Sequence, residues 1–231
     1  MRIMKYTLLL LAFVSAGAFA QVDEDELGAW YMLMWNHNPA PGKTIGFQGD
    51  IQHRNWDLGG DLEQLLIRGG VSWTPSGSKV KYTVGYAHIT SGAYGSSSGK
   101  SREHRFYQEA LVSQKVGMRG FVSHRFRLEQ RDVDNQDMRN RLRYSLGLNY
   151  PLNQDTLGKG AVYLSLYNEL FINLEQDIGA GRQVDYFDRN RSYAALGYSV
   201  SDRTRLQFGY MHQELDNYGK GQLQLNWFQS F

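Results

Sequence analysis

The sequence of 231 residues contains no cysteine and only four prolines. Without cysteine the chain can form no disulfide framework and offers no site for a cysteine-linked lipid anchor. This absence does not argue against export, because an exported protein needs no disulfide. The scarcity of proline is compatible with long β-ladders, in which nearly every backbone N–H has to donate a hydrogen bond.

Long apolar runs are absent beyond residue 20, so no later segment offers the roughly 20 apolar residues of a membrane-spanning helix. Residues 1–20 have the order of a secretory signal peptide, with basic residues before a short apolar core, 7–14, and a small-x-small site, Ala18-Phe19-Ala20. We expect cleavage after this site and export of residues 21–231. The alternative is a hydrophobic N-terminal anchor.

An excess of charge of either sign is also missing. The sequence contains 25 Lys+Arg and 23 Asp+Glu, and cleavage would remove Arg2 and Lys5 but no acid, which leaves 23 of each. A net charge of zero predicts no nucleic-acid partner. The 15 tyrosines and five tryptophans suit the aromatic girdles of a transmembrane barrel.

After residue 20 the sequence is a series of segments with period-2 alternation and no convincing helix. Turn signals such as Asn38-Pro39-Ala40-Pro41-Gly42 and Pro75-Ser76-Gly77-Ser78 alternate with generally longer or more polar connections. This rhythm is typical of a barrel with short turns at one end and longer loops at the other. The predicted strands are 27–37, 44–56, 63–74, 79–90, 102–115, 120–132, 139–151, 161–174, 187–201, 203–215 and 220–231.

One face of these segments carries arginine, glutamate and tyrosine, and the other face is apolar. Lysine is rare on the polar face, whereas a solvated sheet surface usually mixes lysine and glutamate. Because arginine tolerates partial burial and forks to carboxylates, we interpret the polar face as the packed lumen of a barrel. The candidate lumen residues are Arg125, Arg127, Glu129, Arg131, Arg139, Arg141, Arg143, Tyr167, Glu169 and Arg205.

The last predicted strand ends on an aromatic residue. Leu223, Leu225, Trp227 and Phe231 share a mostly apolar face, which resembles the closing strand of bacterial outer-membrane barrels, although Gln229 departs from that pattern. We therefore expect insertion into the outer membrane of a Gram-negative bacterium, with membrane lipids and the outer-membrane assembly machinery as partners. The alternative is an ordinary half-buried strand of a soluble sheet.

These patterns predict a single all-β domain over residues 21–231, an antiparallel up-and-down transmembrane β-barrel of about 10–12 strands. Bacterial single-chain barrels have an even number of strands, but the predicted strands number eleven. We therefore expect ten or twelve strands in the wall. Either residues 21–37 thread or plug the lumen instead of forming a full strand, or one of the other predicted strands is wrong.

Several local runs suggest a family. The most specific is His124-Arg125-Phe126-Arg127-Leu128-Glu129-Gln130-Arg131, which is preceded by Glu103-His104-Arg105-Phe106-Tyr107-Gln108 and followed by Asn140-Arg141-Leu142-Arg143-Tyr144. With these runs the mature chain resembles the uncharacterised bacterial domain-of-unknown-function family 2490. The resemblance implies an exported β-sheet protein of the outer membrane, and it brings no established activity, substrate or catalytic residue.

The arginine cluster on neighbouring predicted strands has two compatible interpretations. A ring of arginines can form a basic constriction that selects anions. Alternatively, arginines paired with Glu103, Glu109, Glu129 and Glu169 can fill a narrow barrel and tie its strands together, which is the interpretation we favour. The expected function is a narrow anion-favouring pore or a structural envelope protein, and Arg127→Ala or Arg141→Ala is expected to change the anion preference.

Catalytic and metal-binding patterns are weak. Ser123 and His124 are consecutive and so point to opposite faces of a strand, and the sequence has no Gly-x-Ser-x-Gly motif. Asp132, Asp134 and Asp137 lack the spacing of a calcium loop. We predict no catalytic residue, metal or cofactor. A lipid-modifying or hydrolytic barrel enzyme and a soluble periplasmic β-barrel or β-sandwich binding protein remain the alternatives.

Overall fold

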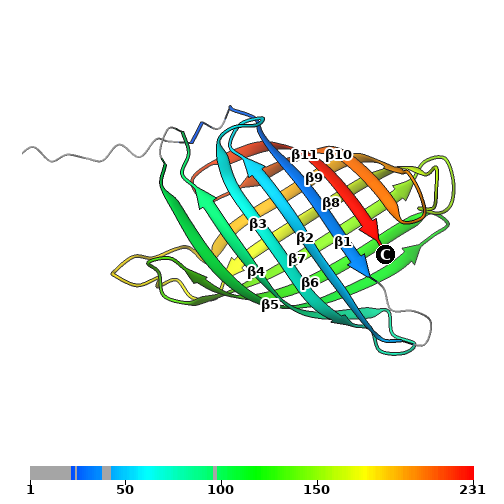
Figure 1. The fold of residues 1–231 in the computed structure, drawn as a ribbon, viewed down its shortest axis with the longest axis horizontal. Coiled ribbons are helices and arrows are strands. Elements are labelled where there is room, and N and C mark those ends of the chain that lie inside the picture. The colour runs from blue at the N-terminus through cyan, green and yellow to red at the C-terminus, as the bar shows by residue number, and fades with distance from the viewer. Residues whose placement is uncertain (1–21, 24, 38–42, 96–97) are drawn as a thin grey trace, which may run out of the picture.

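The computed structural model describes residues 22–23, 25–37, 43–95 and 98–231, so the predicted signal peptide lies outside the described residues. Within these ranges eleven strands close into one β-barrel (Figure 1). No helix in the described ranges is long and apolar enough to cross a membrane. The strands are β1 (Gly28–His37), β2 (Ile45–Asn55), β3 (Leu62–Trp73), β4 (Val80–Gly92), β5 (Lys100–Val116), β6 (Gly120–Val133), β7 (Arg139–Pro151), β8 (Val162–Asn173), β9 (Phe187–Ser199), β10 (Thr204–Glu214) and β11 (Gly219–Ser230).

The closure of the barrel differs from the expectation of an even, wholly antiparallel wall. Consecutive strands pair antiparallel, but β1 pairs with β11 in parallel, with Ala29 opposite Leu223 and Asn36 opposite Ser230. An up-and-down sheet with an odd number of strands has its first and last strands running the same way, so only a parallel ladder can close it. Residues 28–37 are therefore a full strand of the wall and not a plug.

The two ends of the barrel differ less in loop length than the sequence suggested. The longest connection, 174–186, lies at the end that holds Gly28, called here the N-terminal end. At the C-terminal end, which holds Phe231, the connection 152–161 is also long. It folds back on itself, because Asn153 Nδ2 donates to Gly160 O (2.9 Å). It also packs against β9, because Gly160 N donates to Ser199 O (2.8 Å). Composition alone did not reveal this packing against β9.

The strands alternate between an apolar outer wall and a polar interior. Leu196 and Phe208 on the outer wall are 61% and 59% exposed, whereas Glu129 and Arg127 on the interior are buried. A water-soluble sheet buries its apolar face, so the distribution here is inverted. The buried apolar residues form only small clusters, the largest of which is Trp30, Met32, Tyr193, Ala195 and Met211 on β1, β9 and β10.

Two interior tyrosines lie against glycines on the neighbouring strand. Tyr163 faces Gly197 across the β8–β9 ladder, and Tyr107 faces Gly85 across the β4–β5 ladder. A Cβ atom at Gly197 would come within 2.2 Å of the Tyr163 ring, and one at Gly85 within 2.4 Å of the Tyr107 ring. Glycine is needed at these positions because the aromatic ring occupies the space of the side chain.

Candidate functional site: the interior cavity

The barrel interior contains a cavity of about 320 Å³, lined by side chains from every strand except β4. Among the described residues, ten arginines line it and a single carboxylate does, that of Glu169. The arginines are Arg54, Arg68, Arg105, Arg125, Arg131, Arg141, Arg143, Arg189, Arg191 and Arg205. The lining runs from Arg131 and Arg189, near the N-terminal end, to Arg205 and Phe228, near the C-terminal end. The surface that meets the cavity therefore carries more positive than negative groups.

The other interior carboxylates lie behind this surface, within an arginine–glutamate network. Glu129 on β6 is fully buried and central, since its Oε2 accepts from Arg141 (2.7 Å) and its Oε1 accepts from Arg143 (2.7 Å) and Arg105 (3.4 Å), with Arg127 at 3.9 Å. The other predicted counter-ions are paired too: Glu103 with Arg105 and Arg131, Glu109 with Arg127, and Glu169 with Arg125 and Arg143. These pairs link β5, β6, β7 and β8 laterally.

Aromatic rings lie among the guanidinium groups. The ring centroid of Phe171 is 4.2 Å from the guanidinium carbon of Arg143 and 4.7 Å from that of Arg191. Arg141 and Arg189 also lie over this ring, at 5.2 and 5.9 Å. Each contact is a cation–π arrangement, which partly offsets the cost of burying a cation.

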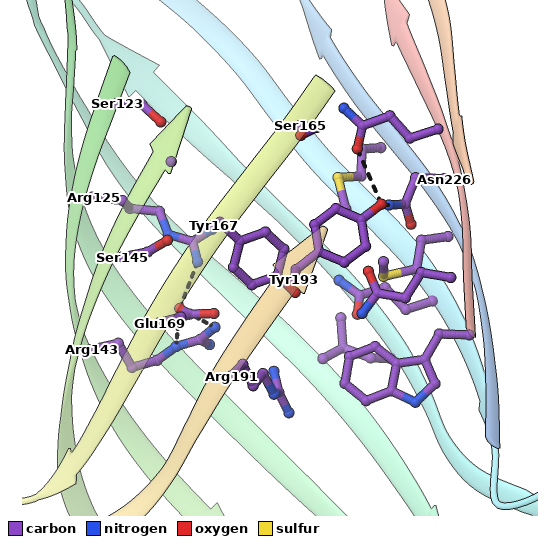
Figure 2. A pocket seen from close by; sticks show the side chains of 18 of the residues that line it. Ser123, Arg125, Arg143, Ser145, Ser165, Tyr167, Glu169, Arg191, Tyr193 and Asn226 are labelled. Atoms are coloured by element: carbon purple, nitrogen blue, oxygen red, sulfur yellow. Dashed lines mark hydrogen bonds and ion pairs between the residues drawn. The ribbon is translucent and has the colours of Figure 1, made fainter. Parts of the chain in front are cut away.

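The opposite side of the cavity is less charged. Tyr167 and Tyr193 stack with their ring centroids 4.8 Å apart, and Asn226 Nδ2 donates to the hydroxyl of Tyr193 (2.8 Å). Figure 2 shows Tyr167 beside Arg125 and Glu169, with Tyr193 beyond it on the side of Asn226. Methionines 32 and 34 of β1 line the same side. The cavity thus has an arginine-rich side on β6 and β7 and an apolar, amide-bearing side on β1, β10 and β11.

At the N-terminal end, residues before β1 are fastened to the rim of the barrel. Lys220 Nζ donates to Glu26 O (2.7 Å) and to Asp23 O (3.1 Å). The Tyr94 hydroxyl donates to the Glu26 carboxylate (2.8 Å), and this hydrogen bond raises the pKa of Tyr94. The segment that leads into β1 is therefore held at the mouth of the barrel.

The predicted lumen residues fall into two groups, those that line the cavity and those that are buried but do not line it. Seven of them line the cavity: Arg125, Arg131, Arg141, Arg143, Tyr167, Glu169 and Arg205. The other three, Arg127, Glu129 and Arg139, are buried but are not among its lining residues. Of the predicted membrane-insertion residues, Leu225, Trp227 and Phe231 are exposed and Leu223 is partly exposed.

Sequence reasoning missed several residues of the cavity. Arg54, Arg68, Arg189 and Arg191 line it, and so does Trp30. The same alternation could have found the arginines, because Arg189 and Arg191 share a face of β9 with Tyr193, and Arg54 shares a face of β2 with Asp50 and Gln52. Alternation could not show that Trp30 and Arg54 are cross-strand partners, which depends on register.

The cavity does not assemble a nucleophile and base from its described residues. Ser123 lines the cavity, but the adjacent His124 pairs with the outward-facing Tyr144 (2.9 Å to its hydroxyl), and none of the described lining residues is histidine. The described residues contain no group of three or more His, Cys, Asp or Glu side chains suited to a metal ion. The chemistry that this arrangement offers is recognition of negative charge.

Comparison with known proteins gives a family. Residues 27–224 match the family described as "Protein of unknown function (DUF2490)". An uncharacterized protein of Methylorubrum extorquens is similar, with 29% identity over 217 residues that cover 90% of this chain and 89% of the relative. No solved structure matches the chain. Because the family match spans most of the sequence, the resemblance noted from the His124–Arg131 run is confirmed, and the chain belongs to the DUF2490 family of proteins of unknown function.

Proposed function

We propose that this protein is an exported outer-membrane β-barrel whose interior forms a narrow pathway that favours small anions. The apolar outer wall supports the membrane location, since Leu196, Phe208 and Trp227 expose large apolar surfaces that a bilayer would cover. Closure into a barrel supports it as well, because a strand can cross lipid only where every backbone hydrogen bond is satisfied. The predicted signal peptide is consistent with export.

The observation that carries the proposal is the excess of arginine over carboxylate on the cavity wall. Seven of its ten described arginines have a carboxylate within ion-pair distance, whereas Arg54, Arg191 and Arg205 have none among the described residues. In a barrel surrounded by a low-dielectric medium, such a wall lowers the energy of an anion and raises that of a cation. Glu169 and the carboxylates behind the wall cancel part of this field, and the net positive charge comes from the arginines without a carboxylate partner, Arg54, Arg191 and Arg205. The cavity volume of about 320 Å³ suits small solutes.

A structural role in the envelope is the second candidate, and the buried network around Glu129 favours it. Lateral ion pairs across four strands resist deformation of the wall whether or not solutes pass. This role is compatible with the pore, because the same arginines that pair with buried carboxylates also line the cavity. We assign no catalytic residue, since the serines that line the cavity have no histidine beside them among the described lining residues.

The test is ion selectivity in a planar lipid bilayer under a KCl gradient. Arg205 lines the cavity near its C-terminal end and makes no ion pair with any described residue; its guanidinium lies 5.8 Å from the Phe228 ring. Arg205→Gln should move the reversal potential toward that of an unselective pore. Arg119→Gln is the matched control, because Arg119 lies in the turn at the same end, is 39% exposed in its side chain and pairs with Asp155 (2.6 Å) outside the cavity.

The proposal predicts anion preference for the native protein and for Arg119→Gln, and a reduced preference for Arg205→Gln. A correctly folded protein that inserts but shows no conductance would overturn the pore and leave the structural role. Cation preference of the native protein would contradict the electrostatic argument itself.

A further inference from the structure

Two buried arginines of the cavity have no carboxylate partner among the described residues. Arg54 on β2 is 6% exposed and Arg191 on β9 is 5% exposed. Arg54 donates only to amide oxygens, those of Gln52 (3.1 Å) and Gln64 (2.7 Å). Arg191 donates through Nε to Gln213 (2.8 Å), and no described residue accepts from its two terminal nitrogens. A buried guanidinium is normally paired with an anion.

Both arginines lie against the same aromatic ring. The guanidinium carbon of Arg54 is 3.9 Å from the ring centroid of Trp30, and that of Arg191 is 4.8 Å away. The indole is fixed in place, because its Nε1 donates to Glu63 (2.9 Å). Arg191 also lies 4.7 Å from the Phe171 ring, so it stands between two aromatic groups. Cation–π contacts compensate burial only in part, which leaves positive charge directed at the cavity.

The one carboxylate among the described lining residues is paired with other arginines. Glu169 is held by Arg125 (2.6 Å) and Arg143 (2.6 Å) and forms no ion pair with Arg191. In Figure 2 dashed lines join Glu169 to both of those arginines, while Arg191 reaches into the cavity with no marked partner. The terminal nitrogens of Arg191 are therefore available to an anion that enters.

An apolar surface adjoins this charge. Trp30, Met32, Tyr193 and Met211 form a buried cluster, and Met34 packs against it. Most of these side chains line the cavity too. An inorganic anion would contact the arginine and leave this surface without a partner, whereas an anion with an apolar body would cover both.

We propose that the cavity holds a binding site for small organic carboxylates with an apolar body, with the carboxylate on Arg191 and beside Arg54, and the body against Trp30, Met32 and Tyr193. This proposal rests on the proposed function, because it names the class of solute that the anion pathway would select. Occupation would supply the missing charge partner for both arginines, and Arg–carboxylate recognition is directional and can be bidentate.

Calorimetric titration of the purified full-length barrel in non-ionic detergent micelles tests the site with four probes: benzoate, its uncharged analogue benzamide, acetate and inorganic phosphate. Empty micelles supply the blank. We expect saturable benzoate binding that is about ten-fold or more tighter than acetate binding, because acetate lacks the apolar body. Benzamide and phosphate should bind more weakly than benzoate as well. Arg191→Gln should weaken benzoate binding roughly 10- to 100-fold, through loss of a charge-assisted contact.

Arg54→Gln should weaken benzoate binding in the same direction, and Arg119→Gln, outside the cavity, should leave it unchanged. The site is refuted if native protein shows no saturable benzoate binding, or if acetate, phosphate or benzamide binds as tightly as benzoate. These probe comparisons on native protein hold even where a variant fails to fold. Unaltered benzoate binding in folded Arg191→Gln would also overturn the assignment. Anion-selective conductance without benzoate binding would refute this binding site but not the pore. Benzoate binding without conductance would refute the pore but not this binding site.

Discussion

Glu129→Gln removes the negative charge that four interior arginines share. Glu129 is fully buried, and its two oxygens accept from Arg105, Arg141 and Arg143, with Arg127 nearby. A glutamine of nearly the same shape keeps one acceptor oxygen but turns an NH₂ group toward a guanidinium. The substitution therefore creates no cavity, and its effect isolates the charge.

The magnitude follows from the contacts that are lost. A hydrogen bond to a charged partner contributes about 1.5–3 kcal/mol net, and breaking a buried ion pair from one side costs about 3–5 kcal/mol because the remaining charge stays buried. Arg143 retains Glu169 and Arg141 retains Asp188, which limits the loss. We expect the free energy of unfolding to fall by about 3–5 kcal/mol.

Urea unfolding of the barrel in detergent micelles measures this change. Glu214→Gln is the control, because Glu214 is exposed and, among the described residues, pairs only with His212 (2.9 Å). It should change stability by about 0.5 kcal/mol or less. Equal unfolding midpoints and slopes for native protein and Glu129→Gln would refute the network as a source of stability.

Two further changes probe other parts of the barrel. Gly197→Ala places a Cβ within 2.2 Å of the Tyr163 ring and should lower the free energy of unfolding by about 1–3 kcal/mol. Gly69→Ala is the control, because a Cβ there would have nothing within 4 Å, and it should leave the free energy of unfolding unchanged. Equal losses for the two variants in urea unfolding would contradict this reasoning. Deletion of Phe231 should reduce the amount of barrel assembled in the outer membrane of cells while purified protein still folds in micelles, and undiminished assembly would remove the predicted role of the terminal aromatic residue.

Much of the fold was predictable because its two faces differ in chemistry along every strand. The predicted strand 120–132 corresponds to β6 (Gly120–Val133), and 63–74 corresponds to β3 (Leu62–Trp73). Arginine alternating with Phe126 and Leu128 is a period-2 signal that no helix would produce. Alternation identified the interior face for the same reason, and it placed Arg125, Arg141 and Arg143 where the cavity is found.

The remaining features depend on register and closure, which alternation does not encode. The stacking of Arg54 and Arg191 on Trp30 brings β9 to the consecutive strands β1 and β2, from which it is distant in sequence. The parallel β1–β11 ladder contradicts a rule drawn from barrels with an even number of strands. Export, membrane insertion and engagement of the assembly machinery concern partners outside the chain and stay predictions.

The central claim is that the apolar wall meets lipid while the arginine-bearing face is enclosed. The absence of native cysteine permits single labels at Phe208→Cys, on the outer wall, and at its neighbour Gln207→Cys, on the interior. With the protein in liposomes, a nitroxide on the lipid acyl chains should quench a fluorophore at position 208 strongly and one at 207 weakly. Strong quenching at 207 with none at 208, or no quenching at either position, would contradict the account.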